Sequence, residues 1–419
     1  MYLSTIGLRH GEAGAGRSGR GIAANVFALG AVSLMTDISS EMVTAVLPLY
    51  FILTLQVSPI AYGLMDGLYT GATALLRLVG GYVADRARRR KAVAGIGYGV
   101  SAVAKLGLLA AGGSVTAIGA VIVADRCGKG LRTAPRDALI TLSTPEPLLG
   151  RAFGVHRAMD SLGAFAGPLA ALGVLSLVGT TSAAAFDALF VTSFCVAALG
   201  LLILMTTVRD RREPRPPAGT VSPRTAAGLL RITAVRRLAC AACVLGVATV
   251  GDGFVYLMLM RGQGFGAGWF PLLAVGTNLS YLLLAAPLGA LADRCGRLPV
   301  VLGGYAALLA VYLLLFGPFA GTAVVVVTVG LYGAFYAATD GVLMALAGPT
   351  LPKPMRTTGI ALIQTVQALA YFASSVCFGL AWQYWGPAAA TRIAAGGVAV
   401  AIVLTAALLR RPTPVEVRT

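Results

Sequence analysis

Two acidic residues lie one helical turn apart inside an apolar stretch near the start of the chain. Asp37 and Glu41 are four positions apart within the stretch 22–53, so on a helix they share a face. A charge near the centre of a bilayer costs about 3 kcal/mol on insertion scales, and two carboxylates in one site of low dielectric do not both ionise readily. One of them is therefore expected to hold an exchangeable proton, as proton coupling requires. A purely structural role, with both acids bonded to neighbouring helices, is the alternative.

A buried arginine is the predicted partner of these acids. Arg126, with Asp125 beside it, falls near the middle of the apolar stretch 114–141. An arginine within about 5 Å favours the ionised form of a carboxyl, and a movement that separates the two removes the effect. We therefore predict a proton-coupling group of Asp37, Glu41 and Arg126. A fixed ion pair between two helices is the alternative for Arg126.

Further charged residues gather where this stretch ends and the next begins. Helical periodicity places Arg132 and Arg136 on one face, and His156 and Asp160 on another. We interpret these residues, together with Arg157, as a salt-bridge gate that breaks and re-forms during transport. A static network is the competing interpretation.

The second half of the chain has few interior charges but several aromatic and amide side chains. A charged first half that faces a more aromatic second half suits an amphipathic organic solute, although most such aromatics simply pack in cores. For Lys105, in the first half, pairing with an acid is favoured over contact with an anionic substrate. The predicted substrate cavity comprises Lys105, Asp252, Tyr256, Asn278, Tyr281, Tyr336, Asp340, Gln364 and Gln367.

Composition shows which elements must position these residues. The chain is 57% hydrophobic and 12% charged, with a mean hydropathy of +0.82, whereas a soluble protein carries about a quarter charged residues. Apolar stretches of about 20 residues recur throughout, long enough to cross a bilayer as helices. They predict twelve transmembrane helices at 22–53, 57–84, 92–111, 114–141, 152–178, 183–208, 236–261, 266–292, 298–317, 321–348, 356–384 and 388–409.

The net charge of +17 reflects membrane topology. Lys and Arg concentrate in alternate connections and are nearly absent from the others, which is the positive-inside pattern. We therefore expect both termini in the cytoplasm, a bacterial-type inner membrane and no nucleic-acid partner. No cleavable signal is expected, because residues 1–20 lack an apolar core.

A charged motif repeats almost half a chain length apart. G-x-x-A-D-R-x-x-R occurs at 81–89 and at 289–297, each time between apolar stretches, which indicates a duplicated membrane bundle. We interpret its role as conformational, through charge contacts on the cytoplasmic face. The residues assigned to this role are Gly81, Asp85, Arg86, Arg90, Gly289, Asp293, Arg294 and Arg297.

A linker rich in proline and charge divides the chain. The predicted organisation is a cytoplasmic tail (1–21), a six-helix bundle (22–208), the linker (209–235), a second six-helix bundle (236–409) and a second tail (410–419).

These motifs resemble the major facilitator superfamily. The resemblance implies an all-α integral membrane fold of twelve helices in two pseudo-symmetric six-helix bundles. The string at 126–130 is similar to the family's R-x-x-Q-G, with Lys129 in place of glutamine. The drug–proton antiporter motif G-x8-G-x3-G-P is matched at Gly154, Gly163, Gly167 and Pro168, although its final glycine pair is missing.

The chain is therefore expected to be a secondary transporter, and not an enzyme. Our prediction is proton-coupled efflux of a small organic molecule, powered by the proton gradient without other cofactors, by a monomer in the lipid bilayer. Uptake of a small solute, efflux of a metal cation and a non-transporting membrane sensor are the alternatives. Efflux of a metal cation is disfavoured because the chain has only two histidines, and imidazole is a preferred ligand of such ions. The six cysteines, including Cys240 and Cys243 in a C-x-x-C, are interpreted as buried free thiols.

Overall fold

The computed structural model describes most of the chain, and every regular element among the described residues is helical. The described residues are 23–87, 90–145, 148–179, 182–210, 228–340, 342, 346, 351 and 356–410.

The first half contains six long helices. The first helix is extended by a short helical segment and a π-helical turn before the chain reverses. In chain order these elements are α1 (Ala24–Thr44), α2 (Leu47–Leu49), η1 (Tyr50–Thr54), α3 (Pro59–Ala87), α4 (Arg90–Ala110), α5 (Val115–Leu142), α6 (Leu149–Val178) and α7 (Ala183–Thr207).

The second half repeats this plan with one helix interrupted. Its elements are η3 (Leu229–Arg231), α9 (Thr233–Ala248), α10 (Asp252–Gln263), η4 (Ala267–Trp269), α11 (Phe270–Cys295), α12 (Arg297–Phe316), α13 (Thr322–Thr339), α15 (Arg356–Trp385) and α16 (Pro387–Arg410).

The twelve predicted transmembrane helices are confirmed. Among the described residues, ten segments are long and apolar enough to cross a membrane. The two further long helices, α3 and α5, complete the twelve. Six charged side chains in the middle and second half of α5, from Asp125 to Asp137, lower its hydropathy.

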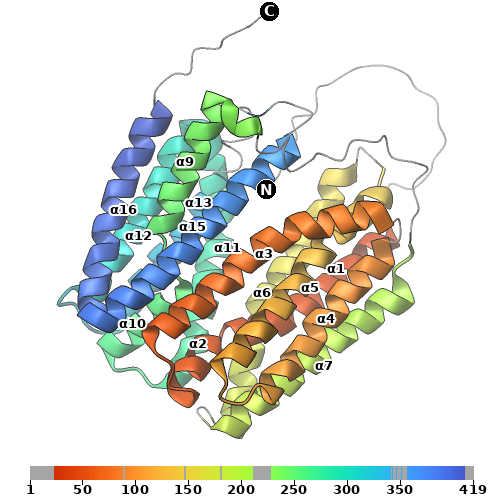
Figure 1. Cartoon of the computed structure of the whole chain (residues 1–419), viewed down its shortest axis with the longest axis horizontal. Coiled ribbons are helices and arrows are strands. Elements are labelled where there is room, and N and C mark those ends of the chain that lie inside the picture. Colours follow the sequence, from red (N-terminus) through yellow and green to blue (C-terminus); the bar gives the residue numbers. More distant parts are fainter. Residues whose placement is uncertain are drawn as a thin grey trace, which may run out of the picture.

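The helices pack as two bundles that lie side by side (Figure 1). In the first, α1 packs on α6 and α7, and α5 packs on α3 and α4. In the second, α13 packs on α11 and α12, and α9 packs on α15 and α16. The bundles meet mainly through α3 against α15 and α6 against α11.

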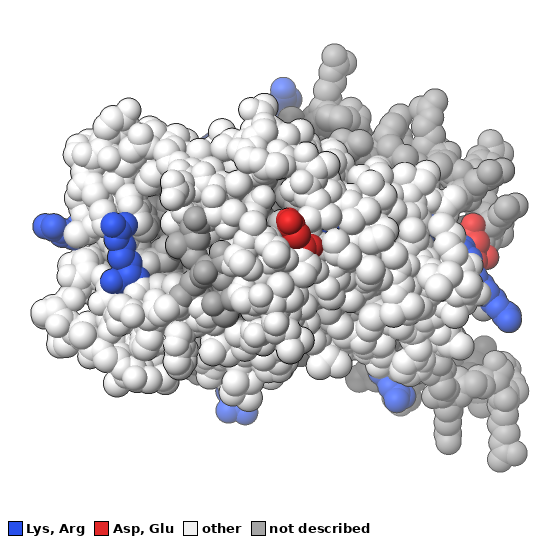
Figure 2. Space-filling model, turned by 90° about the horizontal axis from the view of Figure 1, so that it is seen from below, with Lys and Arg blue, Asp and Glu red and all other residues white. Residues whose placement is uncertain are grey.

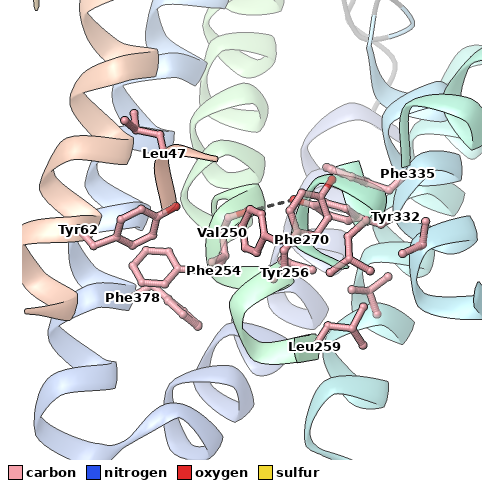
Figure 3. Packing of buried hydrophobic residues seen from close by; sticks show 14 of the residues in the cluster. Leu47, Tyr62, Val250, Phe254, Tyr256, Leu259, Phe270, Tyr332, Phe335 and Phe378 are labelled. Atoms are coloured by element: carbon pink, nitrogen blue, oxygen red, sulfur yellow. Dashed lines mark hydrogen bonds between the residues drawn. The ribbon is translucent and has the colours of Figure 1, made fainter. Parts of the chain in front are cut away.

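Several close contacts between the bundles, through α3 and α15, lie toward one end of the molecule. Gly63, near the start of α3, approaches the backbone of Ser375, and Gly379 approaches the backbone of Pro59. The rings of Tyr62 and Phe254 meet edge to face at 4.6 Å, and Figure 3 shows them together with Phe378. We call this the closed end.

The opposite end carries the chain connections predicted to be cytoplasmic. There Asn25, at the start of α1, hydrogen-bonds Ser143 and the backbone of Arg209, which follow α5 and α7. Seen from below Figure 1, the molecule shows a mostly uncharged surface with isolated charged side chains (Figure 2). This distribution agrees with the loop asymmetry of the sequence.

Two predicted spans differ from the structure. The seventh, predicted as one helix over 236–261, is broken at Thr249–Gly251, where the backbone is extended. A hydroxyl takes the place of a helical acceptor, because the N–H of Val250 donates to the Tyr312 oxygen at 2.8 Å. The tenth, predicted to reach 348, ends as α13 at Thr339, and Asp340 is extended.

Candidate transport site

Asp37 and Asp160 form a carboxyl pair between α1 and α6. Their side chains lie within hydrogen-bond reach of each other, and two carboxyls in such contact are stable when they share a proton. Ser33 donates to Asp160 Oδ1 at 2.7 Å, and Arg136 Nη1 donates to the Ser33 oxygen at 3.1 Å. The pair is therefore fixed by a network that joins three helices.

Three arginines surround this carboxyl pair. Arg132 Nη2 lies 4.0 Å from Asp37 Oδ1, and its guanidinium lies over the ring of Tyr98 at 4.7 Å. Arg136 Nη1 is 3.8 Å and Arg157 Nη1 is 3.6 Å from the carboxyl oxygens of Asp160. The structure thus brings the predicted gate residues and Asp37 into one cluster. The arginine that contacts Asp37 is Arg132.

Arg126 lies close enough to α1 for its charge to interact with Glu41, but its direct partner is Asp125. Its guanidinium binds Asp125, through Nε at 3.0 Å and also through Nη2, and it lies over the ring of Tyr69 at 3.7 Å. Lys105 forms an ion pair with the other Asp125 oxygen, to which Ser101 donates at 2.6 Å. This pair lies within α5 itself, so it differs from the inter-helix pair that was the alternative for Arg126. It forms because the adjacent carboxylate is the nearest acceptor for the guanidinium.

Lys105 therefore lies inside the first bundle. Its ammonium is buried with Asp125 and lines a small cavity, about 20 Å³ for a water-sized probe, together with Ser40 and Tyr69. All residues that line this cavity belong to the first half. Lys105 thus pairs with an acid of its own bundle, which is the interpretation that the sequence favoured over contact with a substrate.

Glu41 on α1 and Lys129 on α5 carry opposite charges that interact with each other. Lys129 is also close enough for its charge to interact with Asp37. Glu41 also interacts with Asp252 from the opposite half. Sequence reasoning noted Lys129 only as a replacement within a motif. Its position one turn after Arg126 was the signal for a second interior cation.

The glycines of the antiporter-like motif explain how α6 approaches the acids on α1. A Cβ at Gly163 would lie 3.0 Å from the Asp37 Cβ and 2.7 Å from the Leu34 carbonyl oxygen. At Gly167 a Cβ would lie 2.6 Å from the Glu41 Cβ. Pro168 is buried within α6, whereas Gly154 has open space around it. Two of the three glycines are thus required by the packing of α6 on Asp37 and Glu41.

In the second half, Asp252 is held by two tyrosines. It begins α10, where an acid is favoured by the helix dipole. Tyr332 donates to its Oδ1 at 2.7 Å, and Tyr336 donates to the same oxygen. Tyr256 is buried, and its ring meets those of Tyr332 and Phe270 edge to face. Two of the predicted aromatic residues, Tyr336 and Tyr256, therefore lie around Asp252.

The remaining cavity candidates are more scattered. Asn278 on α11 donates to the Ala164 carbonyl on α6 at 3.4 Å and so bridges the bundles. Tyr281 donates to Asp340 at 3.2 Å within the second bundle, where Asp340 is exposed. The side chain of Gln367 hydrogen-bonds the Tyr305 hydroxyl, and Gln364 is partly buried on the same helix.

One interior acid was missed by sequence reasoning. Asp66, on α3, accepts hydrogen bonds from Ser375 at 2.6 Å and from Tyr371 at 3.2 Å, both on α15. It is the same type of residue as Asp37, within the second predicted apolar stretch. The cost of burying a charge in a span was the signal that could have identified it.

The two copies of the charged motif lie at the ends of α3 and α11. Nothing is described of the surroundings of Gly81 or of the side chains of Asp85 and Arg86. Arg90 begins α4.

In the second copy, Asp293 and Arg294 are exposed near the end of α11, and Gly289 has open space around it. Gly296 has φ +93° and joins α11 to α12, which begins at Arg297. The copy thus contains a turn that requires glycine.

The cysteines are free, as predicted, but they are not buried. Cys127 is partly buried, and the other five are exposed on helix surfaces. Cys240 and Cys243 share one face of α9 because they are three positions apart. The exposed surface of a membrane helix is itself apolar, so a weakly polar thiol can lie there as well as in a core. This explains why cysteines predicted to be buried are exposed.

Comparisons with known proteins agree with this architecture. The family model described as Major Facilitator Superfamily matches residues 29–277 and 265–419. An uncharacterized MFS-type transporter of Methanocaldococcus jannaschii is 30% identical over 375 residues, covering 87% of this chain and 90% of that protein.

Solved structures show the same fold. The nucleoside transporter NupG superposes with a TM-score of 0.76 at 15% identity, over 93% of this chain and all of that one. A peptide transporter of the POT type superposes with a TM-score of 0.75 at 15% identity, over 94% and 95% of the two chains. With its twelve-helix fold and the family match over nearly its whole length, the chain belongs to the major facilitator superfamily and is a membrane transporter of that type.

Proposed function

We propose that this protein is a proton-coupled secondary active transporter that exports a small organic molecule. The observation that carries the proposal is the contact of Asp37 with Asp160, with Arg132 at 4.0 Å. A carboxyl pair that holds one proton beside a guanidinium loses the proton when the cation approaches and gains one when it withdraws. Helix movements of a fraction of a nanometre would therefore load and unload the site.

Alternating access between the two bundles supplies those movements. The bundles meet through the closed end, and the basic connections lie at the opposite end. In the orientation favoured by the positive-inside rule, the termini and the linker are cytoplasmic. The closed end would then face the outside, and the substrate site would lie between the two repeats, as in other secondary transporters.

A small amphipathic organic molecule fits the groups that face each other between the bundles. Glu41 and Lys129 supply opposite charges from the first half, and Asp252 with Tyr332 and Tyr336 supplies an acid and aromatic rings from the second. Rings of this kind bind apolar groups, and the charges orient polar ones. The proton gradient is the proposed source of energy.

Export is favoured over uptake by the antiporter-like motif on α6. Two glycines of this motif, Gly163 and Gly167, permit the packing of α6 on α1 and lie directly against Asp37 and Glu41. Uptake of a small solute would use the same acids in the reverse coupling. The direction of proton movement therefore distinguishes the two functions.

Proteoliposomes with an imposed pH gradient test the proposal. The purified protein is reconstituted with a pH-sensitive dye inside, and a panel of cationic, zwitterionic and neutral organic solutes is added in turn. We expect at least one solute to dissipate the gradient, and Asp37→Asn to abolish proton movement for that solute. Asp187→Asn, which changes an exposed acid at the start of α7, is the matched control and should behave as wild type.

Two results would count against the proposal. Transport that continues at the wild-type rate and with the wild-type proton flux in Asp37→Asn would exclude Asp37 from coupling. In inverted membrane vesicles, a solute that leaves the vesicle lumen as protons leave would indicate uptake in the cell rather than export.

A further inference from the structure

Asp66 is an interior acid whose hydrogen-bond partners belong to the other half of the protein. It projects from α3, whereas Ser375 and Tyr371, which donate to its Oδ2 at 2.6 Å and 3.2 Å, lie on α15. These two hydrogen bonds can exist only while the bundles are together at the closed end. The environment of Asp66 must therefore change whenever that end opens.

The break in the seventh span makes room for this carboxyl. A Cβ at Gly251 would collide with the Asp66 carboxyl and would lie 2.8 Å from the Tyr371 hydroxyl. Two positions later, a Cβ at Gly253 would collide with the Tyr62 hydroxyl. The backbone of the second half is thus shaped around side chains of α3.

The charges around Asp66 are not balanced in the closed state. The groups that face it are Tyr62 on its own helix, Asp252 from α10, and Tyr371 and Ser375 from α15. Among these described groups there is no cation, and Asp252 is a second carboxyl whose charge interacts with that of Asp66. Ionising both would place like charges on opposite sides of the joint between the bundles.

The unbalanced charge can be relieved in two ways, one in the open state and one in the closed state. Water can solvate an ionised Asp66 once α3 and α15 separate, whereas a bound proton removes both the repulsion and the cost of burying the charge while they are together. Proton affinity therefore differs between the two conformations, and a proton must shift their equilibrium by the same factor.

We propose that Asp66 is a second proton-binding site, which binds its proton when the bundles close at this end and releases it when they separate. The proposal rests on the proposed function because it requires two access states. In the orientation given above, acid outside the cell closes the outer end. Proton uptake from the outside would thus be tied directly to closure, at a residue remote from the Asp37–Asp160 pair.

Distance measurements between two spin labels test this site without any substrate. Leu64 on α3 and Tyr384 on α15 are 41% and 72% exposed and flank the closed end, so Leu64→Cys and Tyr384→Cys provide the labelling sites. The six native cysteines are first replaced by serine. Electron–electron double resonance then gives the populations of short and long distances in lipid nanodiscs at acidic and alkaline pH.

We expect the ratio of closed to open molecules to fall by about fivefold or more from acidic to alkaline pH. Asp66→Asn, which mimics the protonated carboxyl, should remain closed and lose the pH response. Ser375→Ala should keep the response but start from a less closed population. The control Asp187→Asn should respond like the parent protein.

The outcomes separate this proposal from the proposed function. A parent protein whose distances ignore pH, or an Asp66→Asn variant with the full response, would overturn the second proton site. So would a response that disappears in Asp252→Asn but persists in Asp66→Asn. None of these distances depends on solute transport, so failure of the proteoliposome assay at Asp37 would leave this result standing, and the reverse also holds.

Discussion

Gly167 on α6 and Glu41 on α1 are in such close contact that a Cβ on the glycine would lie 2.6 Å from the Cβ of the acid. The same helix pair places Gly163 against Asp37. The carboxyls that we assign to coupling are therefore positioned by the absence of side chains on the facing helix. Any increase in side-chain size there must displace α6 from α1.

Replacing these glycines by alanine tests whether they are needed for the packing of α6 on α1 or only as members of the sequence motif. Gly163→Ala and Gly167→Ala should each lower stability by about 1–3 kcal/mol, because a methyl group is forced into an occupied interface. The temperature of half-unfolding in detergent measures the effect. Gly154→Ala, the motif glycine with open space around it, is the control. Equal effects at all three positions would contradict the packing explanation.

The ion cluster inside the first bundle predicts an order among its variants. Asp125→Asn should be the most damaging, by about 3–5 kcal/mol, because it leaves the buried Lys105 and Arg126 without an acid. Lys105→Gln should cost less, since Arg126 still binds Asp125. The yield of monodisperse protein and the thermal unfolding curve report the order. A Lys105→Gln protein less stable than Asp125→Asn would refute this assignment.

The carboxyl pair predicts how transport depends on pH. Burial of Asp37 and the nearby Arg132 are unchanged in Asp160→Asn, but the neighbouring carboxyl is replaced by a neutral amide, so Asp37 ionises more readily than in the parent protein. The pH profile of proton-coupled transport should then move to lower pH by about one unit or more. The measurement is initial transport rate against pH in proteoliposomes. An unchanged profile would show that Asp160 does not share the proton.

The break in the seventh span, which lies against α3, suggests a rescue experiment. Gly253→Ala should destabilise the closed end, because its methyl group meets the Tyr62 hydroxyl and the Pro48 ring. Tyr62→Phe removes one of the two obstacles, so the double variant should regain part of the loss. Spin-label distances across α3 and α15 provide the readout. If Tyr62→Phe makes Gly253→Ala worse, the proposed steric conflict is absent.

The sequence was sufficient for the helices because membrane spans depend on local composition. Apolar stretches, the linker and the repeated motif predict twelve helices in two bundles, and the structure and the family match confirm them. The break at Thr249–Gly251 was not predicted, because the stretch is apolar on both sides of it. Two glycines flanking Asp252 were the available hint.

Pairings among the interior charges could not be predicted with the same success. Arg126 and Arg132 both lie on α5, and periodicity alone does not determine which of them faces Asp37. That choice depends on how α5 is rotated and tilted against α1, and hence on close contacts such as Gly128 with the backbone of Gly97 and Ser101. Asp66 was missed for a related reason, since its partners are more than 300 positions away.

The tyrosine beside the broken span connects side-chain chemistry to backbone conformation. Tyr332 has one hydroxyl proton, and the acceptors within its reach include Asp252 Oδ1 at 2.7 Å and the Val250 carbonyl oxygen at 3.5 Å. If Asp252 becomes neutral or binds a ligand, it competes less strongly for that proton, which can then turn toward the backbone. A change in charge at one carboxyl would in this way be converted into a change of bonding in the main chain itself, at the point where the membrane helix is weakest.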